Sequence, residues 1–409
     1  MSCWTSLLPM RQEIRLVKMF DPGPSAVKWF FRLGRPLSPL YAGLMRIRLR
    51  AFQKGFLRSI RLERPVISVG NLSMGGTGKT PHVIFICRHF SAQGIRPAIL
   101  TRGYGGRAGK GPLVVSTAES VLSTPEEAGD EAYLLACSLK GVPVIAGSNR
   151  WRSGRLAVKE LGAELLVLDD GFQHLKLERD LDLVLLPAPA PFSSGRVFPG
   201  GDLREPIAGL ERADAAILTG SRSLADGELE LAKQLVHARF PELPIFGSSV
   251  IPGQVYTVGL GESEDRAEGE RMDSHLSEIS HEEVRGRAAY LFCGIASPQR
   301  FISTVRELDM VPMGHRWFRD HWPYSLSDLH AVVASAEQAG CHVLVTTMKD
   351  WVKIAPLWQR LSMELTTDTT RVRPELLVIG IDLDLEPGFV RLLNDFWNRV
   401  GRGTDFPRD

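Results

Sequence analysis

The stretch from residue 65 to residue 82, PVISVGNLSMGGTGKTPH, constrains the fold more than any other part of the chain. It opens with a β-branched, apolar run from Val66 to Val69, which predicts a buried parallel strand. Four glycines follow between Gly70 and Gly78, and Lys79-Thr80 then opens a segment of helical character. Strand, glycine loop, Lys-Thr and helix together predict a phosphate-binding P-loop, whose backbone N–H groups and helix N-terminus point at the anion.

The residues of this loop have separate predicted roles. Lys79 is expected to reach the β- and γ-phosphates of a nucleotide, and the Thr80 hydroxyl to hold Mg²⁺. The loop departs once from the pattern GxxxxGK[ST], because Ser73 stands where that pattern has glycine. The alternative, a glycine-rich turn with an incidental Lys-Thr, leaves the flanking strand and helix unexplained. The predicted nucleotide-binding residues are Ser73, Met74, Gly75, Gly76, Thr77, Gly78, Lys79 and Thr80.

Length and composition bound the class of protein. The chain has 409 residues, more than the ~250–300 at which single cores stop growing, so two domains are expected. Its five cysteines lie far apart without a CxxC pair, and three of them lie within apolar runs. These three are predicted to be small core side chains in a reducing compartment. We expect no signal peptide, because residues 1–20 lack a continuous apolar region and a cleavage site. We also expect no bilayer-spanning helix, because no run approaches ~18 apolar residues.

Residues 22–62 contain nine Lys or Arg and no Asp or Glu. A helix is predicted from Ser38-Pro39 onward, and its basic side chains lie opposite an apolar stripe. The stripe consists of Tyr41, Met45, Leu49, Phe52, Phe56 and Ile60, and the basic side is Arg46, Arg50, Lys54 and Arg61. Such a helix suits an anionic membrane surface. The alternative is a helix that packs its apolar face on its own domain, and the absence of acids favours the membrane.

Short apolar runs alternate with helical segments up to residue 245, which predicts a doubly wound parallel sheet. The loop TRGYGG at 101–106 follows a predicted strand and carries Arg102 and Tyr104, which a plain turn does not need. A helix is predicted over 125–139 with Asp130 in its first turns, where an acid can serve the helix dipole or catalysis. Asn149-Arg150 opens a further predicted helix.

Two later stretches carry acidic and polar side chains at strand ends. Leu165 to Leu168 is an apolar strand followed by DDGFQH, the Walker B arrangement that sets a carboxylate beside the P-loop threonine. Asp169 and Asp170 cannot both point the same way from an extended strand, so one is assigned to the metal and the other to a neighbouring donor. The loop FPGGDLREP at 198–206 carries Arg204 and Glu205, as substrate loops often do.

The second half of the chain reads as a smaller α/β domain. Two extended segments over 246–260, separated by Pro252-Gly253, predict a hairpin, and the charged stretch 261–283 predicts a linker or surface insertion. Asp320-His321 lies between aromatic residues and is either a tuned base or a surface pair. The predicted domains are a basic segment (1–62), a P-loop domain (63–245), a hairpin linker (246–285), an α/β domain (286–385) and a C-terminal helix and tail (386–409).

The motifs taken together resemble the tetraacyldisaccharide 4'-kinase family. SVGNLSMGGTGKTP, TRGYGG, GDEAYLLA, LVLDDGFQH, GDLREP, FCGIASPQRF, FRDHWPYS and TTMKD occur in that family's order, over roughly residues 36–400. The resemblance implies a P-loop lipid kinase that uses ATP and Mg²⁺ to phosphorylate the 4'-hydroxyl of an acylated glucosamine disaccharide 1-phosphate in lipid A biosynthesis. It also implies a peripheral protein at the anionic, cytoplasmic face of a bacterial inner membrane, with no nucleic acid as partner.

The resemblance further implies roles for single residues. Asp130 would accept the hydroxyl proton and His321, brought up by domain closure, would be its partner, with Lys79 at the transferring phosphate. The metal side would be Thr80, Asp169, Asp170 and Glu205. The predicted substrate-binding residues are Arg102, Tyr104, Arg150, Gln173, His174 and Arg204. Trp322 departs from the family pattern, which often has a second histidine there.

Two other functions are compatible with the P-loop. A nucleotide switch of the partitioning-ATPase type would carry a lysine near the start of the loop, whereas this chain has Ser73-Met74 there. A P-loop kinase for a soluble small molecule would have no use for the basic amphipathic helix.

Overall fold

The computed structural model describes residues 25–106, 111–259, 276–367 and 374–401. The chain forms two compact units, each made of separate stretches of sequence. Unit 1 comprises the chain up to Val83, residues 164–250 and the chain from Asp384, and unit 2 comprises Ile84–Ala163 and Ile251–Leu383. Each domain predicted from the sequence is a single uninterrupted range, unlike these two units, and the predicted limits remain a proposal.

Unit 1 is built on a parallel sheet in the order β8-β7-β6-β1-β5. The predicted P-loop-type α/β fold with a parallel sheet is thus confirmed. The bounds of these strands are β1 Val66–Asn71, β5 Leu165–Asp169, β6 Leu181–Pro187, β7 Ala215–Thr219 and β8 Ile245–Val258, whose residues up to Val250 belong to this unit. The strands are buried along almost their whole length in this unit, as expected for a parallel sheet covered on both faces.

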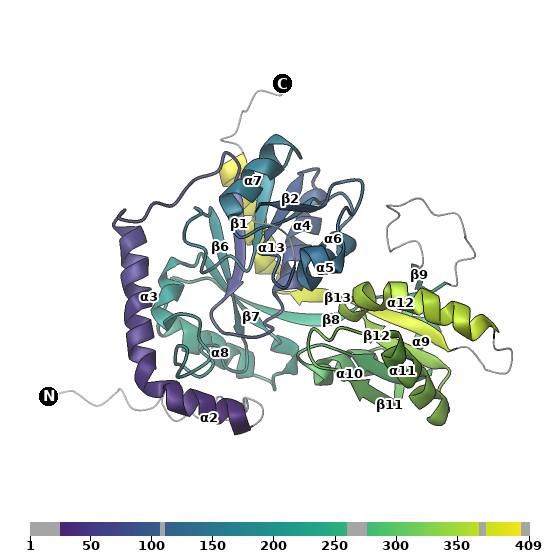
Figure 1. Cartoon of the computed structure of the whole chain (residues 1–409). Helices are drawn as coiled ribbons and strands as arrows, with labels where there is room; N and C mark the ends of the chain where they lie inside the picture. Colours follow the sequence, from purple (N-terminus) through teal and green to yellow (C-terminus); the bar gives the residue numbers. More distant parts are fainter. Residues whose placement is uncertain (1–24, 107–110, 260–275, 368–373, 402–409) are drawn as a thin grey trace. The chain divides into compact units, whose positions relative to one another are not determined.

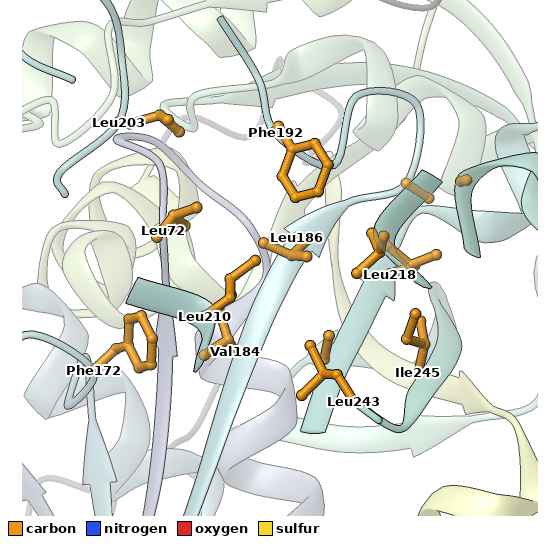
Figure 2. Close-up of a cluster of buried hydrophobic side chains, with 14 of the residues drawn as sticks. Leu72, Phe172, Val184, Leu186, Phe192, Leu203, Leu210, Leu218, Leu243 and Ile245 are labelled. Carbon is orange, nitrogen blue, oxygen red and sulfur yellow. The ribbon is translucent and has the colours of Figure 1, made fainter. Parts of the chain in front are cut away.

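One core cluster of unit 1 joins this sheet to the loops that follow it (Figure 2). Val184, Leu186 and Leu218 come from the strands, whereas Leu72 and Phe172 come from the two loops that carry the predicted site. Because these loop residues are anchored in the core, the polar side chains beside them are held in place. The helices that lie wholly within unit 1 are α2 Ser25–Gly34, η1 Arg35–Leu37, α3 Ser38–Gln53, η2 Ile207–Arg212, η3 Ser221–Ser223, α8 Glu228–His237 and α13 Pro387–Val400.

Helix α3 corrects the prediction for the basic segment (Figure 1). It ends at Gln53 and is followed by Gly55 with a positive φ of 75°, so Phe56 and Ile60 do not extend its apolar stripe. The part of the predicted stripe within the helix, from Tyr41 to Phe52, is half-buried. Ser38 donates a 2.7 Å hydrogen bond to the Val197 carbonyl, which fixes the start of the helix on unit 1.

Unit 2 contains two groups of paired strands. In one, β2 Pro97–Thr101 runs parallel to β4 Val144–Ala146, which is antiparallel to β3 Leu113–Ser116. In the other, the order is β11-β10-β12-β13 and all pairs are parallel. The strands of the second group are β10 Ala288–Cys293, β11 Val311–Trp317, β12 Val343–Thr347 and β13 Glu375–Leu385.

The hairpin predicted at Pro252-Gly253 is wrong. β8 continues without a turn through Val258, and β9 Leu276–Ile279 pairs with its end in antiparallel fashion. Gly253 serves close packing instead, because a Cβ there would lie 2.9 Å from the Ile381 backbone. Part of the predicted linker therefore forms β9 and α9 His281–Val284, while residues 260–275 lie outside the described residues.

A long helix of unit 2, α12, was not predicted from the sequence. α12 Met348–Thr367 follows β12 directly and buries Trp351, Ile354 and Leu361 in a core cluster of the unit. Pro356 inside this helix weakens the helical signal of the sequence. The other helices are α4 Lys79–Ser91, from Ile84 onward, α5 Pro125–Ala128, α6 Asp130–Ser138, α7 Arg150–Lys159, α9, α10 Pro298–Glu307 and α11 Leu326–Gln338.

Candidate active site

The phosphate loop of unit 1 has the geometry of an anion-binding turn. Gly75 and Gly78 have φ values of 118° and 80°, which side chains with a Cβ rarely adopt. A Cβ added at Gly75, Gly76 or Gly78 would meet no atom of the described residues within 4 Å, so the space over the loop is open. The Thr77 hydroxyl is buried and has no hydrogen-bond partner in the described ranges. Both observations fit a loop whose polar groups are satisfied by a bound phosphate.

His82 supports this loop from within the first turn of α4. One ring nitrogen, Nδ1, lies 2.7 Å from the Gly78 carbonyl, and the other, Nε2, lies 2.8 Å from the Ser248 hydroxyl. Because a carbonyl only accepts, Nδ1 carries the hydrogen and Nε2 accepts from Ser248. Burial lowers the pKa of His82 to about 4, so the ring is neutral at physiological pH. A rigid, uncharged link thus connects the loop to β8.

The two aspartates of the DDGFQH stretch have different environments. Asp169 ends β5, is buried and stands beside Val69 in the parallel register with β1. Asp170 follows with a positive φ of 54°, a strained backbone that turns its carboxylate toward other partners. Lys79 Nζ lies 3.5 Å from Asp170 Oδ1, and Arg204 Nη1 donates to both carboxylate oxygens at 2.8 Å. Burial acts to raise the pKa of Asp170, but Lys79 and Arg204 outweigh it and hold the pKa below its usual value.

Glu205 is held in a buried cluster beside this group. Its carboxylate receives two hydrogen bonds of 2.7 and 2.8 Å from Arg212 and one of 2.8 Å from Gln173. Arg212 also donates to the Phe172 carbonyl at 2.9 Å and stacks over the Phe172 ring at 3.5 Å. Sequence reasoning missed Arg212, which joins the loop after β5 to the loop that carries Arg204.

The oxygen ligands at this end of the sheet fit Mg²⁺ in part. Thr80 and Asp169 are the ligand types that Mg²⁺ prefers, and it usually takes one or two protein oxygens together with phosphates and water. Within the described ranges no group of three or more His, Cys, Asp or Glu is arranged to hold a metal unaided. Asp170 and Glu205 are engaged by cations of the chain, so their metal role remains a prediction.

In unit 2, Asp130 and His321 meet directly. His321 Nδ1 lies 2.9 Å from Asp130 Oδ2, although the two residues are 191 positions apart in sequence. Both belong to the same compact unit, so the contact does not depend on the domain closure that the sequence suggested. His321 has a positive φ of 58°, a strained conformation of the kind found at functional sites.

The helix predicted over 125–139 is in fact two helices, and the break places Asp130. Gly129 separates α5 from α6 with a φ of 85°, so Asp130 opens a new helix. A Cβ at position 129 would lie 2.3 Å from the Tyr104 carbonyl, so only glycine lets the TRGYGG loop approach. In the motif GDE, Gly129 is therefore required for steric reasons, whereas Asp130 has the predicted chemical role.

Two lysines one turn apart on α12 flank this pair. Lys349 Nζ donates to Asp320 at 2.8 Å and lies 3.5 Å from His321 Nε2. Since an ammonium only donates, Nε2 is the acceptor and Nδ1 carries the hydrogen that His321 gives to Asp130. Lys353 Nζ lies 3.9 Å from Asp130 Oδ2 on the other side. Sequence reasoning singled out TTMKD, which contains Lys349, and missed Lys353.

Comparisons with known proteins assign the chain to a family. The family model described as tetraacyldisaccharide-1-P 4'-kinase matches residues 30–397. The chain belongs to this family. A tetraacyldisaccharide 4'-kinase of Desulfotalea psychrophila is 40% identical over 324 residues, covering 79% of this chain and 88% of that protein. The corresponding protein of Syntrophus aciditrophicus is 37% identical over 341 residues, covering 82% and 88%.

A solved structure of the family is also similar to the chain. The LpxK protein of Aquifex aeolicus, in complex with ATP, is 28% identical, has a TM-score of 0.65 and covers 89% of this chain and 97% of its own. The similarity therefore extends over both units and confirms the family resemblance inferred from the motifs.

The other residues predicted for the family site take varied positions. Arg150 opens α7, is buried and donates to the Gly147 carbonyl at 2.7 Å. Arg102 and Tyr104 are exposed in unit 2, and Tyr104 is 79% exposed. His174 is half-buried in unit 1, in the turn that begins at Gly171. Their substrate contacts remain predictions, whereas Lys79, Asp170, Arg204, Gln173 and Glu205 form connected groups.

Proposed function

We propose that the chain is an ATP-dependent kinase that transfers the γ-phosphate of ATP to the 4'-hydroxyl of tetraacyldisaccharide 1-phosphate, giving lipid IVA. The observation that carries the proposal is the Lys79–Asp170–Arg204 group at an open phosphate loop, in a chain of this kinase family. The ATP bound to the Aquifex aeolicus relative supports ATP as the phosphate donor.

The residues of unit 1 serve the nucleotide. Backbone N–H groups of residues 75–80 bind the phosphates, and Lys79 neutralises the charge that develops on the transferring group. Asp170 keeps Lys79 and Arg204 close together, so that two cations are positioned before the nucleotide arrives. A bound Mg²⁺, held by Thr80 and Asp169, would supply further charge neutralisation on the phosphates.

Asp130 serves the acceptor. A sugar hydroxyl is a weak nucleophile, and a positioned carboxylate relieves it of its proton as it attacks. His321 donates its Nδ1 hydrogen to Oδ2 of Asp130 and thereby orients the carboxylate. Lys349 lies 3.5 Å from the other ring nitrogen, Nε2, and so fixes the orientation of the imidazole that faces Asp130.

The lipid acceptor requires a membrane, and the outer face of the N-terminal helices suits one. Five large apolar side chains at helical spacing are 55–69% exposed there, namely Leu33, Leu37, Leu40, Leu44 and Ile47. Arg46 and Arg50 are exposed beside them. We propose that this face lies in the surface of an anionic bilayer, on the cytoplasmic side of the inner membrane. None of the helices in the described ranges has the length and apolar content needed to cross a bilayer.

Lys79 provides the test. The wild-type protein is incubated with Mg-ATP and tetraacyldisaccharide 1-phosphate in mixed micelles, and lipid phosphorylation is followed by transfer of labelled phosphate. Lys79→Ala should lower turnover by roughly 10³-fold or more, because electrostatic stabilisation of the phosphoryl group is the main catalytic contribution. Lys176→Ala, at an exposed lysine of the same unit, should leave it unchanged.

The same assay separates the competing functions. If soluble sugars are phosphorylated as fast as the lipid substrate, the chain is a kinase for soluble substrates. If ATP is hydrolysed without transfer of phosphate to an acceptor, the chain is a nucleotide switch. Either result in the wild type would overturn the proposal, as would a folded Lys79→Ala protein with normal activity.

A further inference from the structure

Lys353 is a buried cation that the proposed reaction does not yet use. Its side chain is only 9% exposed, and its Nζ lies 3.9 Å from Asp130 Oδ2 and 3.5 Å from Asp350 Oδ1. Burying an ammonium costs free energy unless carboxylates lie near it. Asp130 and Asp350 therefore stabilise the buried Lys353 ammonium at this position.

The environment of Asp350 shows that the lysine is fixed in position. Asp350 is fully buried and accepts hydrogen bonds from the Gly294 N–H at 3.0 Å, the Tyr324 hydroxyl at 3.0 Å and the Thr347 hydroxyl at 2.7 Å. Burial and the nearby Asp350 charge raise the pKa of Tyr324, so its hydroxyl stays a donor. The Lys353 ammonium also lies 5.2 Å from the centre of the Tyr324 ring. An immobile carboxylate and an aromatic face therefore hold the lysine toward Asp130.

We propose that Lys353 is a positioning residue for the proposed phosphoryl transfer and acts through Asp130. Its ammonium and the His321 N–H both lie at Oδ2 of Asp130, which leaves Oδ1 for the incoming hydroxyl. Two contacts at the same oxygen restrict rotation of the carboxylate, so that Oδ1 keeps one orientation. Without the Lys353 ammonium, Asp130 keeps its contact with His321 and loses its contact with the cation.

The proton and bond changes do not involve the lysine. The hydroxyl proton passes to Oδ1 of Asp130, the hydroxyl oxygen bonds to the γ-phosphorus, and the bond between that phosphorus and the β–γ bridging oxygen breaks to release ADP. Lys353 keeps its three protons throughout and stabilises Asp130 in the state before transfer.

The test compares Lys353→Met with wild type on Mg-ATP and tetraacyldisaccharide 1-phosphate. We expect kcat to fall by ~10²-fold through misplacement of the carboxylate, while the KM for ATP stays the same. Lys353→Arg, which keeps the charge, should retain more activity than Lys353→Met. The control is Arg360→Met, which removes an exposed cation from the same helix and should change neither parameter. Thermal unfolding of each variant establishes that it is folded, and Lys353→Gln replaces Lys353→Met if the latter is not.

A double-mutant comparison decides whether Lys353 acts through Asp130. In the Asp130→Asn background, Lys353→Met should lower kcat by less than threefold, because the group it positions is already gone. An undiminished ~10²-fold effect in that background, or a wild-type kcat for Lys353→Met alone, would overturn the inference.

The coupling can also be measured without any substrate. In urea unfolding, the midpoint shifts of Lys353→Met and Asp130→Asn should be non-additive, and additive shifts would count against the contact. An inactive wild type with non-additive urea shifts would refute the proposed kinase function and leave the link between Lys353 and Asp130 standing. The two failures are therefore distinguishable.

Discussion

Removal of the Arg212 guanidinium should strongly destabilise unit 1. Arg212→Met leaves the Glu205 carboxylate, 10% exposed, with the Gln173 amide and no cation. Breaking a buried ion pair from one side costs about 3–5 kcal/mol, because the remaining charge stays desolvated. Loss of the stacking on Phe172 adds roughly 1 kcal/mol. For a domain of 150–250 residues each kcal/mol lowers Tm by about 2–4 °C, so a fall on the order of 10 °C is expected.

The assay is thermal unfolding by circular dichroism for Arg212→Met, Glu205→Gln and the double variant. The double variant should be more stable than Arg212→Met, since it contains no unpaired buried charge. Arg239→Met is the matched control, because Arg239 also lies over a ring, that of Phe192 at 4.6 Å, but is exposed. A Tm for Arg212→Met within about 2 °C of wild type would refute the reasoning, and so would fully additive losses in the double variant.

Three further results are expected. Asp130→Asn and His321→Ala should each lower kcat by ~10²–10⁴-fold with ATP affinity retained, and the double variant should be little worse than the poorer single one; multiplicative losses in steady-state assays would contradict a joint role. Leu40→Ser with Leu44→Ser should weaken sedimentation with anionic vesicles by at least tenfold, since each buried leucine contributes roughly 1.5–3 kcal/mol; unchanged binding would exclude this face. Because His82 has a folded pKa of about 4, below that of the unfolded state, the unfolded chain binds the extra proton first and stability should fall by up to about 3 kcal/mol as pH drops from 6.5 to 4. His82→Gln should lack this part of the pH dependence in urea titrations, and an identical profile would contradict it.

The parts of the fold that the sequence predicts well are locally determined. The strand, glycine loop and helix of the phosphate loop appear as β1 and α4, because turn chemistry and hydrophobic pattern agree there. Prediction from the sequence failed at two glycines, because a glycine can serve either a turn or a close approach of two backbones. Gly253 looked like a turn residue, yet it lets the backbone of β13 approach β8. Gly129 looked like a tolerated helix residue, yet it separates α5 from α6.

The site residues that were missed have no local signal. Arg212 ends a 3₁₀ turn without a motif, and its importance follows from contacts with Glu205 and Phe172. Lys353 resembles any lysine on an amphipathic helix until packing brings it beside Asp130. The predicted apolar stripe of α3 is its half-buried face, whereas Leu40 and Leu44 on the other face are exposed. Periodicity shows that a helix is amphipathic but does not show which neighbour covers which face.

The division of each unit into separate stretches has a consequence for biosynthesis and for protein engineering. Unit 1 needs α13, near the end of the sequence, because Phe389 packs on Phe246 and Glu386 pairs with Lys233 at 2.7 Å. A nascent chain that stops at residue 383 can therefore complete no folded unit 1, and premature stop codons late in the gene should expose apolar strands to aggregation and proteolysis. Neither unit can be expressed as one uninterrupted fragment. Isolating unit 1 requires two new peptide joins, from residue 83 to 164 and from residue 250 to 384.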